Sequence, residues 1–258
     1  MHELGSVDRM ADAPPFRQIA DQLRRAIKRG DLEPGGRVPS EAELIEHYQV
    51  ARMTVRQAVA ELKAEGLVIA EHGRGVFVRS RPSVRRLASD RFARRHREAG
   101  KAAFLAETEL LGSPGVDQLV VDQVAPTERV AERLRLGKTA KVVCRDRRYL
   151  IDNIPVELAT TYVPLAIARG TRIASQDTGP GGVYARIEEA GYQLASFTEE
   201  IGARMPTPLE RRRLSLPGGT PVITVLRVAY DVEGRPVEMT DTVKSAPSYV
   251  LEYSFPAT

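Results

Sequence analysis

Residues 50–66 read VARMTVRQAVAELKAEG, and the helix that this segment predicts organises residues 1–80. Its apolar positions recur at three- and four-residue steps, as in a helix with one buried face: Val55, Ala58, Val59 and Leu62. Gly66 supplies the C-terminal stop signal, so we expect a helix from about Arg52 to Glu65. Arg52 and Arg56 lie one turn apart on one face of this helix.

Two further helices precede this one, and a hairpin follows it. The apolar positions between Phe16 and Ile27 have helical spacing, and Ser40 and Glu43 form the S-x-x-E pattern of a capping box. Two apolar runs within 67–78 flank a glycine-containing tip, EHGRG. Three helices and a hairpin within about 65 residues are typical of a winged helix-turn-helix, whose second helix-turn-helix element enters the DNA major groove.

Charge is distributed unevenly along the chain. Residues 1–80 carry 12 basic and 12 acidic side chains, and residues 81–101 carry 8 basic and 2 acidic ones. A neutral DNA-binding domain needs its basic side chains sorted onto one face. Several basic residues crowd the first helix: Arg17, Arg24, Arg25, Lys28 and Arg29. We expect residues 1–14 to be a disordered tail and residues 81–101 to be a basic linker.

The pattern changes after about Lys101. Strand-like segments and hairpin-type turns dominate, with two helical segments at about 125–134 and 182–191. The expected strands are 120–124, 142–145, 147–151, 156–162, 222–230 and 237–243. This mixture predicts an α+β domain built around an antiparallel sheet, and no internal repeat is expected.

Composition excludes several classes of function. The single cysteine, Cys144, forms no internal disulfide and suits a reducing cytoplasm. No segment approaches the about 18 apolar residues of a membrane span, and the N-terminus lacks the apolar core of a signal peptide. The histidines are too scattered for a metal site, and no catalytic triad, HExxH motif or P-loop is present. We expect no cofactor, no metal and no enzymatic activity.

Several linked motifs fall in order and resemble those of the GntR family of bacterial regulators. They are Pro39-Ser40-Glu41, Val50 to Ala58, Leu62-x-x-Glu65-Gly66-Leu67 and His72-Gly73-Arg74-Gly75. The resemblance covers about residues 16–80 and implies a DNA-binding domain over 15–80.

The rest of the chain resembles the UTRA effector domain of the HutC-type subgroup. The motifs that carry the resemblance are Asp152 to Val156, Tyr162-Val163-Pro164, Ala203 to Pro208 and Gly234 to Glu238. The UTRA domain is similar in fold to chorismate lyase. The resemblance therefore implies that residues 102–258 form an antiparallel sheet with a pocket between the sheet and its helices.

The family resemblance places Arg52, Thr54 and Arg56 at the DNA. An arginine can donate two hydrogen bonds to guanine O6 and N7, and a hydroxyl suits a phosphate oxygen or a base edge. The alternative for these residues is an ordinary solvated face.

Ser40 is either a helix N-cap alone or also a phosphate contact, because unpaired N–H groups point outward at a helix N-terminus. The family commonly has an arginine two residues later, where this chain has Ala42. That departure removes one expected contact, and Arg37 is the candidate replacement.

The wing tip supplies the remaining DNA candidates, His72, Gly73 and Arg74. A glycine lets the backbone approach the minor groove, and an arginine suits the negative potential there. The alternative for His72 is a surface residue in a turn.

Four residues match positions that face the ligand in the UTRA family: Thr161, Tyr162, Tyr184 and Glu238. Arg147 precedes a hairpin turn and shares a strand face with Arg145 but not with Arg148. Relatives that bind sugar phosphates tend to have a second arginine where this chain has Tyr149, and phosphate favours paired charged donors. The effector therefore stays open.

Three more polar residues stand in apolar surroundings and are candidates for the same pocket: Glu199, Arg227 and Asp241. A buried charge needs a partner. Arg227 is therefore equally well explained as a structural ion pair with Glu238 or Asp241. The glycine-rich segment 177–182 is either an anion cradle or a simple connection.

The predicted function is a DNA-binding repressor that a small-molecule effector releases from its operator. Two chains are expected to pair as a homodimer on a pseudo-palindromic operator of double-stranded DNA, with no membrane partner. Two alternatives remain open: a ligand-independent regulator of plasmid or mobile-element genes, and a lyase-like enzyme fused to a DNA-binding module.

Overall fold

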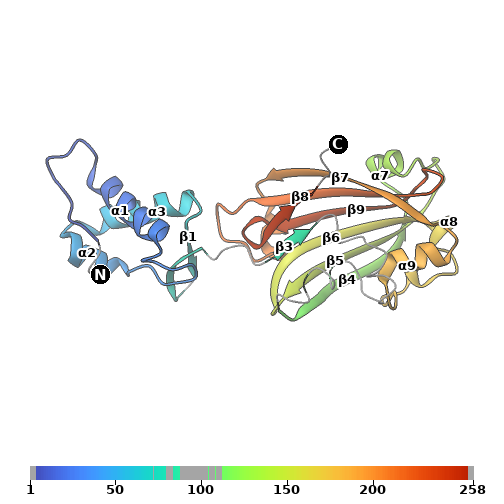
Figure 1. Cartoon of the computed structure of the whole chain (residues 1–258), viewed down its shortest axis with the longest axis horizontal. Helices are drawn as coiled ribbons and strands as arrows, with labels where there is room; N and C mark the ends of the chain where they lie inside the picture. Colours follow the sequence, from blue (N-terminus) through green and yellow to red (C-terminus); the bar gives the residue numbers. More distant parts are fainter. Residues whose placement is uncertain are drawn as a thin grey trace. The chain divides into compact units, whose positions relative to one another are not determined.

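A computed structural model describes residues 4–71, 73–79, 84–87, 104, 108 and 112–254, with side chains of 85–87 excepted. The chain divides into two compact units, the first built on Met1–Arg81 with Pro217–Thr220 and the second on Pro82–Leu216 with Pro221–Thr258 (Figure 1). Each unit is described by itself below. Within the described residues, no helix is both long and apolar enough to cross a membrane.

The first unit is a winged helix-turn-helix, as predicted. Its elements are α1 (Pro15–Arg29), α2 (Glu41–Tyr48), α3 (Arg52–Ala64), β1 (Val68–Glu71) and β2 (Gly75–Val78). One core holds the unit together, and the predicted positions of α3 lie in it: Val55, Ala58, Val59 and Leu62. Strands β1 and β2 pair antiparallel, with Glu71 opposite Gly75 at the wing tip.

Ser40 begins α2 as the sequence predicted. The Glu43 amide donates a 3.2 Å hydrogen bond to Ser40 Oγ, and the Ser40 amide donates a 2.7 Å bond to Glu43 Oε2. This capping box satisfies two backbone donors that the helix itself leaves unpaired. It fixes where α2 starts, and thereby where the turn before α3 falls.

The expected disordered tail lies against the first unit instead. Leu4 and Val7 pack on its core, and His47 Nε2 lies 3.1 Å from the Leu4 carbonyl oxygen. Gln18 Nε2 donates a 2.7 Å hydrogen bond to the Asp8 carbonyl. Apolar side chains in an otherwise polar segment give residues 4–14 enough contact to hold one position, although they form no helix or strand.

The second unit is built on a six-stranded antiparallel sheet in the order β4-β5-β6-β9-β8-β7. The strands are β4 (Pro114–Val124), β5 (Val142–Ile151), β6 (Ile154–Pro164), β7 (Leu194–Arg204), β8 (Val222–Asp231) and β9 (Pro236–Ser245). Strand β7 was not predicted, because most of its residues are exposed and few of them are β-branched. The predicted strands 142–145 and 147–151 are one continuous strand.

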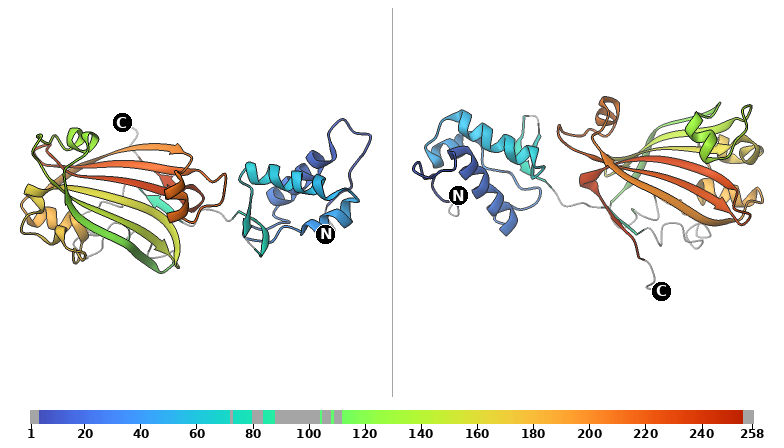
Figure 2. Two further views of the ribbon diagram at one scale, coloured as in Figure 1. Left: turned by 180° about the vertical axis from the view of Figure 1, so that it is seen from behind. Right: turned by 90° about the horizontal axis from the view of Figure 1, so that it is seen from above.

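Helices cover both faces of this sheet. On one face lie α8 (Leu165–Ala168), η1 (Arg172–Ala174) and α9 (Gly182–Glu189), whose Ile167, Ile173 and Ile187 share a core with Val143 and Val237. On the other face lie α7 (Glu128–Arg133) and α10 (Pro208–Arg213). Figure 2 shows α9 and α7 against the sheet from two further sides. We call the face that carries α9 the cavity face.

The second unit contains an internal repeat that the sequence analysis missed. Each element of β4-α7-β5 has an equivalent of the same length in β7-α10-β8. The paired elements start at a constant offset in the sequence: Pro114 with Leu194, Glu128 with Pro208, and Val142 with Val222. Strands β6 and β9 meet at the centre, so the strand order reads symmetrically from either edge. The copies share few residues, which hid the repeat.

A short parallel sheet lies at one end of the cavity face. Strand β3 (Val84–Leu87) pairs with β10 (Tyr249–Glu252), which follows the short helix η2 (Ala246–Ser248). Val84 and Tyr249 are buried with Phe104, Ile151 and Val156 in a separate cluster. Residues 84–87 were expected to be linker, but they form a strand of the second unit.

Helix α10 carries an acid that titrates far below its usual range. Glu210 closes a capping box with Thr207, and Arg204 donates two 2.7 Å hydrogen bonds to its carboxylate. The bonds from Arg204 lower the pKa of Glu210 to about 2, against the opposing effect of burial.

A depressed pKa means that the carboxylate stabilises the fold above its unfolded pKa and that this contribution is lost as pH falls toward 2. We expect Glu210→Gln to be less stable than wild type by about 1 kcal/mol at pH 7, after allowance for screening at this partly exposed pair. The two proteins should converge near pH 2–3 in thermal melts. Glu233→Gln, at an exposed ion pair with Arg235, is the matched control. A pH-independent difference would contradict the assignment.

Candidate functional site

The first candidate surface is the N-terminal end of α3. Arg52 is its first residue, and Arg56 follows one turn later; both side chains are exposed, whereas Thr54 is half-buried. The buried face of the helix belongs to the core, so the arginines project from a rigidly held scaffold. Arg56 Nε lies 3.8 Å from Glu41 Oε1, so the Arg56 side chain reaches the first residue of α2.

Arg37 and Ser40 both precede α2. The Ser40 hydroxyl serves as the N-cap, so its oxygen already accepts one hydrogen bond. Arg37 forms an isolated antiparallel bridge with Phe77 of β2, and its Nε approaches within 3.1 Å of the position that a Cβ on Gly75 would take. Arg37 thus lies along β2 of the wing, on a different element from Ala42.

The wing tip presents Gly73 and Arg74 to solvent. Gly73 has φ +73°, in the left-handed region that favours glycine. The Arg74 guanidinium forms an ion pair with Glu71 and lies 5.4 Å from the centre of the Phe77 ring, while its side chain stays 72% exposed. His72, the third candidate of the wing, lies outside the described residues.

The basic face expected on α1 is partly neutralised. Arg24 forms ion pairs with Asp21 and with Glu65 at the end of α3, and lies 3.6 Å from Glu61. Hydrogen bonds from Arg24 lower the pKa of Glu65. Arg24 therefore joins α1 to α3, and it is a structural residue rather than part of a free basic surface.

The second candidate site is a cavity of about 330 Å³ on the cavity face of the sheet. Five of the eight predicted effector residues line it: Arg147, Thr161, Tyr184, Arg227 and Glu238. They come from β5, β6, α9, β8 and β9. The opposite wall is the segment 176–184, which includes the glycine-rich turn and the start of α9.

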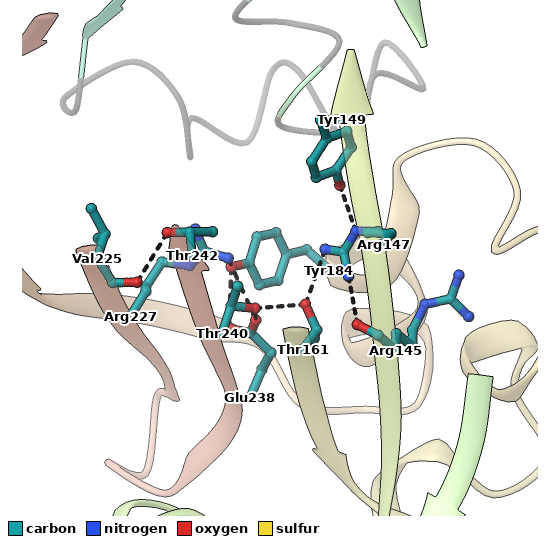
Figure 3. A network of polar contacts seen from close by, with 10 residues as sticks. All are labelled: Arg145, Arg147, Tyr149, Thr161, Tyr184, Val225, Arg227, Glu238, Thr240 and Thr242. Carbon is teal, nitrogen blue, oxygen red and sulfur yellow. Dashed lines mark hydrogen bonds and ion pairs between the residues drawn. The ribbon is translucent and has the colours of Figure 1, made fainter. Parts of the chain in front are cut away.

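A chain of hydrogen bonds crosses the floor of the cavity (Figure 3). Arg147 Nη2 donates to Thr161 Oγ1 at 3.0 Å, and the hydroxyls of Thr161 and Thr240 are 2.7 Å apart. The Thr240 hydroxyl donates to Glu238. Because β5, β6 and β9 are adjacent strands, period-two alternation brings these side chains onto one face.

The Glu238 carboxylate accepts hydrogen bonds from side chains of three elements, β9, α9 and β8. Besides Thr240, Tyr184 OH donates to Glu238 Oε2 at 3.2 Å, and Arg227 Nη2 forms an ion pair with Oε1 at 3.4 Å. The Arg227 guanidinium also lies 5.5 Å from the centre of the Tyr184 ring. Arg227 therefore pairs with Glu238, as one interpretation of the sequence held, and both residues also line the cavity.

Arg145 supports the wall of the cavity. Its guanidinium donates to the carbonyls of Ile173, Ser175 and Gln176, with bonds of 2.7 Å to Ile173 and 2.9 Å to Gln176. Burial lowers the pKa of Arg145 to about 10. These carbonyls fix the segment that leads to the glycine-rich turn, so Arg145 shapes the cavity.

Sequence reasoning missed the aromatic part of the lining. Tyr149 and Phe104 stack with their ring centres 4.1 Å apart, and both border the cavity. Arg147 Nε donates a 2.7 Å hydrogen bond to Tyr149 OH. The shared parity of Arg145, Arg147 and Tyr149 on β5 could have identified Tyr149; nothing local to Phe104 signals its position.

Three predicted effector residues lie elsewhere. Tyr162 and Asp241 lie on the opposite face of the sheet. Tyr162 follows Thr161 and Asp241 follows Thr240, and consecutive residues of a strand face opposite sides. Tyr162 packs beside the core under α7, and Asp241 forms an ion pair with Arg129 of α7. Burial raises the pKa of Asp241. Glu199 accepts a 2.9 Å hydrogen bond from Tyr253 OH and does not border the cavity.

Comparison with known proteins identifies both units. Residues 15–78 match the model of bacterial regulatory proteins of the gntR family, and residues 111–249 match the UTRA domain. The chain belongs to the GntR family. Its UTRA domain places it with the HutC-type regulators.

Three similar proteins cover nearly the whole of this GntR-family chain. An HTH-type transcriptional regulator of Streptomyces coelicolor is 31% identical over 94% of this chain and 93% of its own. The HTH-type transcriptional repressor NagR of Bacillus subtilis is 26% identical over 95% and 96%. The crystal structure of PhnF from Mycobacterium smegmatis superposes with a TM-score of 0.58 at 26% identity, covering 93% of this chain and 100% of PhnF.

These relatives are transcriptional regulators and not enzymes. The GntR-family chain is accordingly a DNA-binding transcriptional regulator whose second unit is a UTRA domain.

Proposed function

We propose that this regulator is a repressor that leaves its operator when a small molecule occupies the cavity of the UTRA domain. The observation that carries the proposal is the cavity itself, about 330 Å³ in volume and floored by a connected polar network. A volume of this order suits a small metabolite, and a few convergent polar groups give specificity. The similarity to NagR, which is named as a repressor, supports repression rather than activation.

The proposed DNA contacts are made by α3 and the wing. Arg52, Thr54 and Arg56 would read bases or phosphates in the major groove, and Gly73 and Arg74 would approach the minor groove, with His72 as a further candidate. Arg37 and Ser40 would contact the backbone at the start of α2.

The proposed effector contacts are Arg147, Thr161, Tyr184, Arg227 and Glu238. Their groups combine guanidinium donors with a carboxylate and hydroxyls, which suits a polar ligand with both acceptor and donor groups. Tyr149 occupies the position at which relatives that bind sugar phosphates tend to have a second arginine. Arg147 is therefore the residue that we expect to pair with an anionic group of the ligand.

Two chains are proposed to act together. A homodimer presents two recognition helices one helical turn of DNA apart, which matches a pseudo-palindromic operator. The effector would favour a state in which the two helices no longer fit this spacing. Size-exclusion chromatography with light scattering should give twice the mass of one chain.

The test combines a metabolite screen with DNA release. An operator is first selected from random DNA by the wild-type protein. A metabolite at 100 times its Kd should stabilise the protein by about 2.7 kcal/mol in a thermal-shift assay. The same compound should release the operator in a gel shift.

Arg147→Ala should abolish both effects, whereas Arg211→Ala, at an exposed position of α10 on the other face of the sheet, should retain them. A broad library without any such compound would favour a ligand-independent regulator.

A further inference from the structure

Tyr149 lies between the cavity and the small sheet formed by β3 and β10. Its hydroxyl accepts the 2.7 Å hydrogen bond from Arg147 Nε, and the Arg147 guanidinium lies 5.3 Å from its ring centre. Its ring stacks on Phe104, with 23° between the two planes. Figure 3 shows Tyr149 at one end of the network that runs along the cavity floor. Tyr149 thus contacts both Arg147, which lines the cavity, and Phe104, which belongs to the apolar cluster beside the cavity.

That cluster holds β3 and β10 in place. Phe104 is buried with Val84 of β3 and Tyr249 of β10, and Tyr149 packs against the same group. The N-terminal segment of the first unit extends to Arg81, and β3 starts at Val84. Strand β3 is therefore only three residues along the chain from Arg81 of the DNA-binding unit.

The β10 side of the cluster has a stiff anchor. Glu157 and Lys244 form a buried ion pair on neighbouring strands, and Tyr249 OH donates a 2.9 Å hydrogen bond to Glu157. Tyr149 is the cross-strand neighbour of Glu157. The hydrogen bond between Tyr149 and Arg147 and the buried ion pair of Glu157 therefore lie near each other in the sheet. Tyr149 contacts this cluster through its stack on Phe104.

We propose that Tyr149 is the positioning residue that couples occupancy of the cavity to strand β3. The inference rests on the proposed function, in which the cavity receives an effector. Arg147 donates from Nε to Tyr149 OH and from Nη2 to Thr161 Oγ1, both neutral acceptors. An anionic ligand group bound to this edge of the guanidinium exchanges neutral acceptors for a charged one and adds the attraction between opposite charges. The exchange releases the phenol, shifts its stack on Phe104 and loosens β3.

The test is amide hydrogen exchange of the full chain without ligand, followed by mass spectrometry. Arg147→Met and Tyr149→Phe each remove the bond between these residues and keep the bulk of the side chain. Each should accelerate exchange in 84–87 and 249–252 by about three- to tenfold, the range for one lost hydrogen bond, and leave β7 and β8 unchanged. The double variant should match the singles, because both remove the same bond. Arg211→Met, at an exposed position of α10, is the control.

Unchanged exchange in either single variant would overturn the proposal. So would additive effects in the double variant, or acceleration throughout the sheet, which would indicate general destabilisation. Because no effector is added, the outcome does not depend on whether a metabolite screen succeeds. Failure of the screen and failure of this coupling are therefore separate results.

Discussion

Replacing Arg52 or Arg56 by alanine is expected to weaken binding to the selected operator by about 1–3 kcal/mol each, roughly 5- to 150-fold. Both side chains are exposed on the first turns of α3, opposite the helix face that packs in the core. Truncation therefore removes DNA contacts without opening a cavity in the protein. A guanidinium that reads guanine loses two hydrogen bonds, and the base edge left behind is unpaired in the complex.

The measurement is a gel-shift titration at fixed salt, with selected and scrambled DNA. A residue that reads a base should lose affinity mainly for the selected sequence, and a phosphate contact should lose it equally for both. Lys63→Ala, near the other end of α3, is the matched control and should stay close to wild type. Wild-type affinity in both arginine variants would exclude this helix end as the reading surface.

Lys244→Met is expected to destabilise the second unit by about 3–5 kcal/mol, the usual cost of breaking a buried ion pair. Lys244 and Glu157 are fully buried and form an ion pair between β9 and β6, so the substitution takes the ion-pair partner from a buried carboxylate. The double variant Glu157→Leu/Lys244→Met should recover most of this loss, since an apolar pair of similar volume needs no desolvation of charge.

Tyrosine fluorescence during urea unfolding reports this effect, because the chain has no tryptophan and only Tyr48 among its eight tyrosines lies in the first unit. Lys141→Met, at an exposed position, is the control. A loss in the double variant as large as in the single one would show that the interactions of Glu157 and Lys244 with their other neighbours dominate.

The first unit was predictable because local rules agree there. The spacing of Val55, Ala58, Val59 and Leu62, the capping pair Ser40–Glu43 and the glycines of the wing all specify the same elements that the structure contains. Arg24 was misjudged because two of its acidic partners lie on α3, far along the chain, where no local pattern reveals them.

The cavity was predictable only in part. Strand parity correctly separated Arg145 and Arg147 from Arg148, which faces Asp117 on the other side of the sheet. Tyr162 and Asp241 were assigned by motif position or by polarity, and a shift of one residue reverses the face of a strand. Phe104 reaches the cavity through tertiary packing alone.

The repeat in the second unit gives one chain two versions of a single half-sheet. Arg147 and Arg227 occupy the same position along β5 and β8, and Glu157 and Glu238 lie opposite equivalent residues of those strands, on β6 and β9. Such an arrangement is what duplication and fusion of a gene for a symmetric pair of chains would leave. One glutamate lines the cavity and its counterpart holds Tyr249, so equivalent positions of the two halves have different surroundings and different tasks.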